Sequence, residues 1–208
     1  MKDFGQMNTF ALKEEIDLKI SKKGKILINR RKVKGKDITI GSNNKKKKYI
    51  LEEGHIIEPL IDLGVFTKEG KVVNSMYDKY KQINRFIEMV EDVLKNYKSD
   101  TLHIIDFGCG KSYLTFILYY YLVEIRHIDA YIIGLDLKET VIEKCNGIAK
   151  KYNYSKLKFE LGDINGYKTD MTVDMVITLH ACDTATDYAL YNAVNWNAQI
   201  IMSVPCCQ

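Results

Sequence analysis

The chain has no C-x-x-C pair among its five cysteines, no apolar secretory segment before them, and no hydrophobic run long enough to span a membrane. Unpaired cysteines without a secretory signal indicate reduced thiols, so we expect a cytoplasmic location. The longest apolar run, Leu114 to Val123, is far shorter than the roughly 20 residues that cross a bilayer. We therefore expect a buried helix there and no membrane contact. A length of 208 residues suits one core-bearing domain with an extension.

Acidic residues are nearly absent between Lys19 and Lys48, where thirteen Lys and Arg stand beside the single acid Asp37. Residues 19–48 therefore carry a net charge of +12. The whole chain has a net charge of +4, so the residues outside this segment carry +4 minus +12, or −8. A basic arm on an acidic body is typical of proteins with a polyanionic partner, and RNA is the simplest one. The alternative is a solvated, lysine-rich hairpin. The predicted nucleic-acid-binding residues are Lys22, Lys23, Lys25, Arg30 and Arg31.

Both common phosphate-binding fingerprints are also missing. The first glycine of a P-loop that ends at Gly110-Lys111-Ser112 would fall on Ile105, and the third glycine of a dinucleotide fingerprint would fall on Tyr113. What is present is an apolar run, 102–105, that ends in Asp106 and a glycine turn. An acid in that turn would repel a pyrophosphate. S-adenosylmethionine carries an ammonium and a sulfonium instead, and it is the better match.

The order of apolar and polar segments predicts an α/β protein. Residues 15–33 favour two strands joined at 22–25, and 50–63 favour a short helix. A three/four apolar spacing predicts a helix from Met76 to Tyr97, with Ser75 as its N-cap. Strands are predicted at 102–106, 131–136, 157–161, 173–180 and 198–204. Three helices are predicted between them: one that follows the first strand and ends near 126, one at 139–152 and one at 183–194. We expect a doubly wound parallel sheet and three regions: 1–48, 49–100 and 101–208.

Acidic residues follow the first three predicted strands of this sheet. Asp106 can meet the methionine end of the cofactor, Asp136 can accept both ribose hydroxyls, and Asp163 can accept the adenine amino group, with Ile164 over the ring. Singly, each acid can equally be a loop residue or a helix cap. The predicted cofactor-binding residues are Asp106, Gly108, Cys109, Gly110, Asp136, Leu137, Asp163, Ile164 and His180.

The fourth and fifth predicted strands end in His180-Ala181-Cys182-Asp183 and in Cys206-Cys207. Such strand ends face the methyl group of a bound cofactor. We therefore predict His180, Cys182, Asp183 and Cys206 as catalytic candidates. His180 or Asp183 would accept a proton from a hydroxyl or nitrogen nucleophile. We predict no metal, because two adjacent cysteines chelate poorly.

These segments resemble the class I S-adenosylmethionine-dependent methyltransferases, and more narrowly the bacterial branch of a little-characterised family. The similar pieces are 81–86, 106–116, 134–138, 179–187 and 205–208. The His180-x-Cys182-x-x-Ala185-Thr186-Asp187 pattern is similar to that of eukaryotic enzymes that methylate a ribose 2′-hydroxyl in the tRNA acceptor stem. It is also similar to a glutathione-transferase-related mammalian protein.

The resemblance implies methyl transfer from S-adenosylmethionine, with RNA as the expected partner. It further implies two strands after the fifth, so we expect this chain to be a fragment that ends after its fifth strand. Three other functions stay open. The acceptor could be a protein or a small molecule, with the lysines only aiding solubility. Cys182 or Cys206 could attack carbon 5 of an RNA pyrimidine as a thiolate. Alternatively, the protein could bind the cofactor and RNA without transferring a methyl group.

Overall fold

The structure is a computed structural model, and it describes residues 5–10, 14–32, 48–179 and 184–204. The chain divides into two compact units, Met1–Lys47 and Lys48–Gln208. The N-terminal unit contains a three-stranded antiparallel sheet in the order β1-β2-β3, made of Gln6–Phe10, Glu14–Ile20 and Ile26–Lys32. The sequence predicted only the second and third of these strands. The unit is therefore a three-stranded sheet and not a simple hairpin.

The pairing register of this small sheet places apolar side chains together. Leu18 lies opposite Ile28 and also opposite Met7, while Ile20 lies opposite Ile26. Side chains alternate between the faces of a strand, so these residues share one face. The turn from Ser21 to Lys25 closes through the Ser21 N–H, which donates to the Lys25 carbonyl at 2.9 Å.

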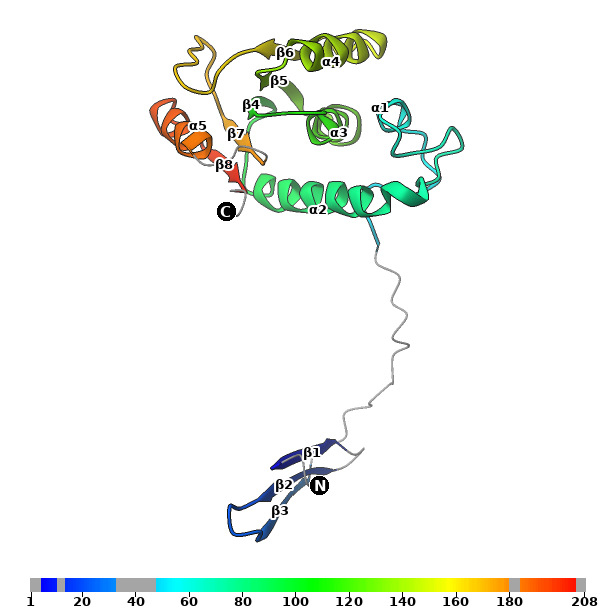
Figure 1. Cartoon of the computed structure of the whole chain (residues 1–208), viewed down its shortest axis with the longest axis vertical. Coiled ribbons are helices and arrows are strands. Elements are labelled where there is room, and N and C mark those ends of the chain that lie inside the picture. Colours follow the sequence, from blue (N-terminus) through cyan, green and yellow to red (C-terminus); the bar gives the residue numbers. More distant parts are fainter. Residues whose placement is uncertain (1–4, 11–13, 33–47, 180–183, 205–208) are drawn as a thin grey trace. The chain divides into compact units, whose positions relative to one another are not determined.

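The C-terminal unit is built on a five-stranded parallel sheet in the order β6-β5-β4-β7-β8 (Figure 1). The strands are β4 (Thr101–Phe107), β5 (Asp129–Asp136), β6 (Leu157–Leu161), β7 (Met175–Thr178) and β8 (Ile200–Ser203). The central strand β4 is apolar almost throughout and is buried on both faces, as parallel strands covered by helices must be. This confirms the predicted Rossmann-like α/β fold.

Helices cover both faces of this sheet (Figure 1). One core packs α2 (Tyr77–Leu94), α3 (Tyr113–Tyr120) and α4 (Glu139–Lys151) against one face, and a smaller core packs α5 (Thr184–Asn195) against the other. The short helix α1 (Glu58–Asp62) joins the first core. A 3-10 turn, η1 (Asn74–Met76), precedes α2, and a π-helical turn, η2 (Tyr121–Ile125), follows α3. None of the helices in the described ranges is both long and apolar enough to cross a bilayer.

Two sequence predictions about the region before β4 were wrong. The segment predicted as a helix over 50–63 is helical only at Glu58–Asp62. Gly54 has a φ of 96°, which is outside the α-helical region, and Pro59 is tolerated in a helix only in the first turn, so the helix begins just before it. The buried Asn84 holds the non-helical start: its side chain accepts from the Leu51 N–H at 2.9 Å. Ser75 does not cap α2, since it lies inside η1.

Candidate functional site

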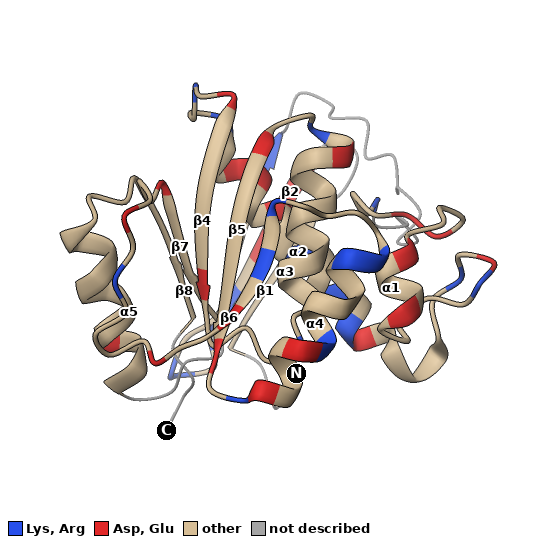
Figure 2. Cartoon of the chain, turned by 90° about the horizontal axis from the view of Figure 1, so that it is seen from above, with Lys and Arg blue, Asp and Glu red and all other residues tan. Residues whose placement is uncertain are grey.

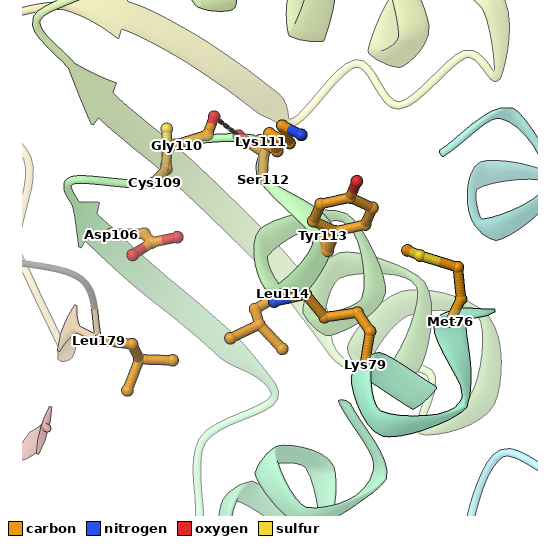
Figure 3. Close-up of a pocket in the computed structure, with 10 residues that line it drawn as sticks. All are labelled: Met76, Lys79, Asp106, Cys109, Gly110, Lys111, Ser112, Tyr113, Leu114 and Leu179. Atoms are coloured by element: carbon orange, nitrogen blue, oxygen red, sulfur yellow. Dashed lines mark hydrogen bonds between the residues drawn. The ribbon is translucent and has the colours of Figure 1, made fainter. Parts of the chain in front are cut away.

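Two cavities lie at the carboxyl ends of the central strands, on either side of the glycine turn. The first, which we name the Asp106 cavity, has a volume of about 470 Å³ and is shown in Figure 3. The second, the Asp136 cavity, has a volume of about 290 Å³. The Asp106 cavity is lined by Met76, Lys79, Asp106, Cys109, Gly110, Lys111, Ser112, Tyr113, Leu114 and Leu179. The Asp136 cavity is lined by Phe107, Gly108, Leu135, Asp136, Leu137, Lys138, Gly162, Asp163, Ile164 and Ala185.

The glycine turn between the cavities needs its glycines for their conformation. Gly108 and Gly110 have φ angles of 68° and 54°, in the left-handed region that residues with a Cβ rarely adopt. The N–H groups of Gly108 and Cys109 donate to the Leu135 carbonyl at 2.9 and 3.1 Å, and the Gly110 N–H donates to Asp136 Oδ2 at 2.9 Å. The turn is thus fixed to the end of β5.

Asp106, at the end of β4, carries the most perturbed carboxyl group of the site. Its side chain is only 6% exposed, and Oδ2 accepts a hydrogen bond of 2.5 Å from the Thr115 hydroxyl. Burial raises the pKa of Asp106 from 3.8 to about 7, with a further increase from the negative charge of Asp136, although the Thr115 hydrogen bond lowers it. A buried carboxylate without a cationic partner is unfavourable, so this position suits a positively charged ligand group.

Asp136 follows β5 and is oriented by the backbone around it. Its Oδ2 accepts from Gly110 as above, and its Oδ1 accepts from the Lys138 N–H at 3.0 Å. A carboxylate has about four acceptor positions, so each oxygen can still accept one more hydrogen bond. Two adjacent hydroxyl groups, as on a ribose, match that remaining capacity.

The rest of the Asp136 cavity suits a flat, apolar ring with a polar edge. Leu137, which is 71% exposed, and Ile164 supply apolar side chains to the lining of this cavity. Asp163 Oδ1 accepts from the Asn165 N–H at 2.9 Å, which leaves its second oxygen for a ligand amino group. The residues present therefore fit an adenosine, and the carboxylates Asp106 and Asp136 oppose a phosphate group.

Cys109 and Cys145 are buried thiols that serve packing. Burial raises the pKa of the Cys109 thiol far above its usual range, so the thiol is neutral, and burial likewise raises the pKa of Cys145. The Cys145 Sγ lies 3.4 Å from the Ser112 hydroxyl, below the glycine turn. Cys109 therefore lines the site as a small apolar residue.

The predicted catalytic residues His180, Cys182, Asp183 and Cys206 lie outside the described residues, so their roles stay predictions. The strand ends that precede them are described. Thr178 of β7 and Ser203 of β8 are paired in the register of the sheet, and within the described ranges neither buried hydroxyl has a hydrogen-bond partner. The carboxyl ends of β7 and β8 therefore lie side by side.

The predicted nucleic-acid-binding residues are not all on one surface. Lys22, Lys23 and Lys25 are exposed at the turn between β2 and β3, and we name this group the basic tip. Arg30 and Arg31 lie near the other end of β3, where they alternate between its faces, and Arg31 stands opposite Glu15. In the C-terminal unit, acidic and basic residues are interspersed over α4, whereas α1 carries only the acids Glu58 and Asp62 (Figure 2).

The predicted site residues do not include Lys79, which lines the Asp106 cavity, or Thr115, which donates a hydrogen bond to Asp106. Thr115 is the only hydroxyl in the apolar segment Leu114 to Leu118, which is a usable signal for a buried polar contact. Lys79 lies on α2, outside the alternating strands and helices, and one lysine among many gives no signal. Only the position of α2 beside α3 brings Lys79 to the site (Figure 3).

Comparison with known proteins gives a family match. Residues 78–208, more than half of the chain, match the family model described as "Methyltransferase domain". A search of curated protein sequences found no match.

Several solved structures are similar in part. Magnesium protoporphyrin IX methyltransferase from Synechocystis PCC 6803, solved with SAH bound, is 19% identical with a TM-score of 0.45, over 60% of this chain and 57% of that one. Protein PH0226 from Pyrococcus horikoshii OT3 is 23% identical with a TM-score of 0.41, over 55% and 51%. Coclaurine N-methyltransferase, bound to N-methylheliamine and SAH, is 15% identical with a TM-score of 0.42, over 54% and 33%. The chain spans less than two thirds of each of these proteins.

Proposed function

Because the chain belongs to the methyltransferase-domain family, we propose that it transfers a methyl group from S-adenosylmethionine to RNA. The cofactor, when bound, supplies an activated methyl group on a sulfonium. What the chain must supply is the binding and orientation of the donor and the acceptor, and where needed a base.

The residues around the glycine turn would hold the cofactor. Asp136 would accept the ribose hydroxyls, Leu137 and Ile164 would cover the adenine, and Asp163 would accept its amino group. Asp106 would face the ammonium of the methionine end. Because Thr115 already fixes Asp106 and the Gly110 N–H already fixes Asp136, little ordering of these two acids is required when the ligand binds.

The charge distribution supports RNA as the acceptor. Residues 1–47 contain fourteen Lys and Arg and five Asp and Glu, a net charge of +9, so residues 48–208 carry +4 minus +9, or −5. The basic tip concentrates three exposed lysines on one turn. Such a cluster binds phosphates with counterion release, and its affinity therefore falls as salt rises.

The test measures transfer of labelled methyl groups into RNA. The full chain is incubated with labelled S-adenosylmethionine and total cellular RNA, and RNase-sensitive label is expected. Asp106→Asn is the inactive control. Label found only in protein or small molecules would refute RNA as the acceptor, and a chain that binds S-adenosylhomocysteine but labels nothing would refute transfer itself.

The basic tip is tested with charge reversal. Lys22→Glu, Lys23→Glu and Lys25→Glu together should weaken RNA binding and reduce the salt dependence of the affinity. A matched control reverses three exposed lysines of the other unit, Lys68, Lys71 and Lys98, with the same change in net charge. An equal loss in both triple variants would show a net-charge effect and no specific role for the tip.

A further inference from the structure

One wall of the Asp106 cavity carries the positive charge of Lys79, which the binding of the cofactor's ammonium group by Asp106 does not explain. The cavity extends from Asp106 past the glycine turn to the starts of two helices, α2 and α3. Figure 3 shows the Lys79 side chain extending from α2 toward the start of α3, with Asp106 on the other side at the end of β4. The cavity thus presents charges of opposite sign on two of its walls.

Lys79 differs in what it contacts from Lys81 on the same helix and from Lys95, the residue that follows the end of α2. Lys81 pairs with Asp78 at 2.7 Å and Lys95 pairs with Asp92 at 2.6 Å. Lys79 is partly buried; its ammonium donates to the neutral Gln82 Oε1 at 2.9 Å and lies 5.4 Å from the centre of the Tyr113 ring. Within the described ranges, no carboxylate forms an ion pair with it. Its charge is therefore available to a ligand in the cavity.

The start of α3 adds hydrogen-bond donors beside this ammonium. Ser112, at the N-cap position with a φ of 56°, makes no side-chain cap, since its hydroxyl donates to the Gly110 carbonyl at 3.2 Å. Ser112, Tyr113 and Leu114 all line the cavity. Uncapped N–H groups at a helix start favour an anion, and here they lie in the same cavity as Lys79, which has no ionic partner among the described residues.

We propose that Lys79, together with the first turn of α3, binds the carboxylate of the cofactor's methionine end. The inference rests on the proposed function, in which S-adenosylmethionine occupies the site. An amino acid carries an ammonium and a carboxylate on one carbon, so a cavity that recognises it needs both an acid and a cation within reach. Asp106 supplies the acid and Lys79 the cation.

The test compares two ligands that differ in this end. S-adenosylhomocysteine has the ammonium and the carboxylate, whereas 5′-methylthioadenosine keeps the adenosine and lacks both. In Lys79→Gln, the affinity for S-adenosylhomocysteine should fall about 10- to 100-fold, as expected for the loss of a charge-assisted hydrogen bond. The affinity for 5′-methylthioadenosine should not change. Lys79→Arg should retain most of the affinity for S-adenosylhomocysteine.

The matched control is Lys81→Gln, two residues along the same helix, where an exposed lysine is already paired with Asp78. It should leave both affinities unchanged. An equal loss of both ligands in Lys79→Gln would overturn the proposal, because it would indicate a general disturbance of the site. A loss in Lys111→Gln that Lys79→Gln lacks would assign the carboxylate to the exposed lysine of the glycine turn instead.

An oxyanion in this cavity could also come from the acceptor, as a phosphate of RNA. In that case Lys79→Gln would leave both cofactor ligands unaffected and would raise the KM for RNA, which would refute our assignment. Failure of the wild-type chain to bind S-adenosylhomocysteine at all would instead refute the proposed function. The two failures are thus distinguished by the wild-type titration alone.

Discussion

Replacing Asp106 by asparagine should stabilise the unliganded protein in alkaline solution. The carboxyl group is buried, and its pKa is about 7 in the folded protein against 3.8 in the unfolded chain. The ionised form is therefore disfavoured inside the fold. Asparagine is neutral and of nearly the same shape, and its Oδ1 can still accept the hydrogen bond from the Thr115 hydroxyl.

The magnitude follows from the two pKa values. The pKa of Asp106 is higher in the folded protein than in the unfolded chain, so ionisation of this group favours the unfolded chain. Below pH 3.8 the carboxyl group is protonated in both states and folding carries no such free-energy cost; above pH 3.8 the cost grows until the pH passes about 7. At about 1.4 kcal/mol per pH unit, the full penalty at pH 8 is on the order of 4 kcal/mol. At about pH 5.5 the Asp106 carboxyl group is ionised in the unfolded chain and protonated in the folded protein, and the cost to the free energy of folding is about 2 kcal/mol.

Urea denaturation at pH 5.5 and pH 8 measures this difference. The stability advantage of Asp106→Asn over the wild type should increase by about 2 kcal/mol between these two values. Asp163→Asn, an exposed acid of the same site, is the control and should show no such increase. An advantage of Asp106→Asn that is independent of pH, or a loss of stability at pH 8, would refute the argument from burial.

Three further predictions concern the same unit. Calorimetric affinity of the wild type for S-adenosylhomocysteine should fall about 10-fold from pH 8 to pH 6, as Asp106 takes up a proton, whereas Asp106→Asn should bind weakly at both values. Gly134→Ala should lower the free energy of unfolding by about 1–3 kcal/mol, since its Cβ would lie 2.6 Å from the buried Phe159 ring, whereas Gly147→Ala, with open space around it, should not destabilise α4. Asn146→Ala should cost about 1–3 kcal/mol in denaturant unfolding, because the Asn146 amide bonds both the N–H (2.9 Å) and the carbonyl (2.7 Å) of Phe159 on the edge strand β6.

The sheet could be predicted because its signals are local. Strand 157–161 was predicted with the bounds that the structure shows, and β4 and β5 extend by one or two residues beyond their predictions. Short apolar runs that end in an acid or a glycine mark such strands without help from the rest of the chain. The acids after three of these strands follow from the same pattern, and the structure brings Asp106, Asp136 and Asp163 to the two cavities flanking one glycine turn.

What could not be predicted depends on contacts between distant segments. Residues 50–57 have a helix-compatible pattern, yet the side chain of Asn84 holds Leu51 in a non-helical conformation from 33 residues away. Strand β1 lacks apolar alternation, and it forms because β2 offers it a pairing edge. Lys79 belongs to the site only because α2 packs beside α3, which no spacing in the sequence encodes.

The strand order explains why a costly acid is found where it is. The chain runs from β4 outward to β5 and β6 and then returns to the other side of β4 as β7, so the connections after β4 and β7 leave in opposite directions. A crevice opens at such a reversal, at the carboxyl end of the central strand. Asp106 lies at that point, where burial makes its charge unfavourable for folding. A hydrophobic or amide side chain would serve the fold better, so we propose that the acid is there for a ligand cation that enters the crevice; Asp106→Asn should then gain stability and lose affinity for that ligand.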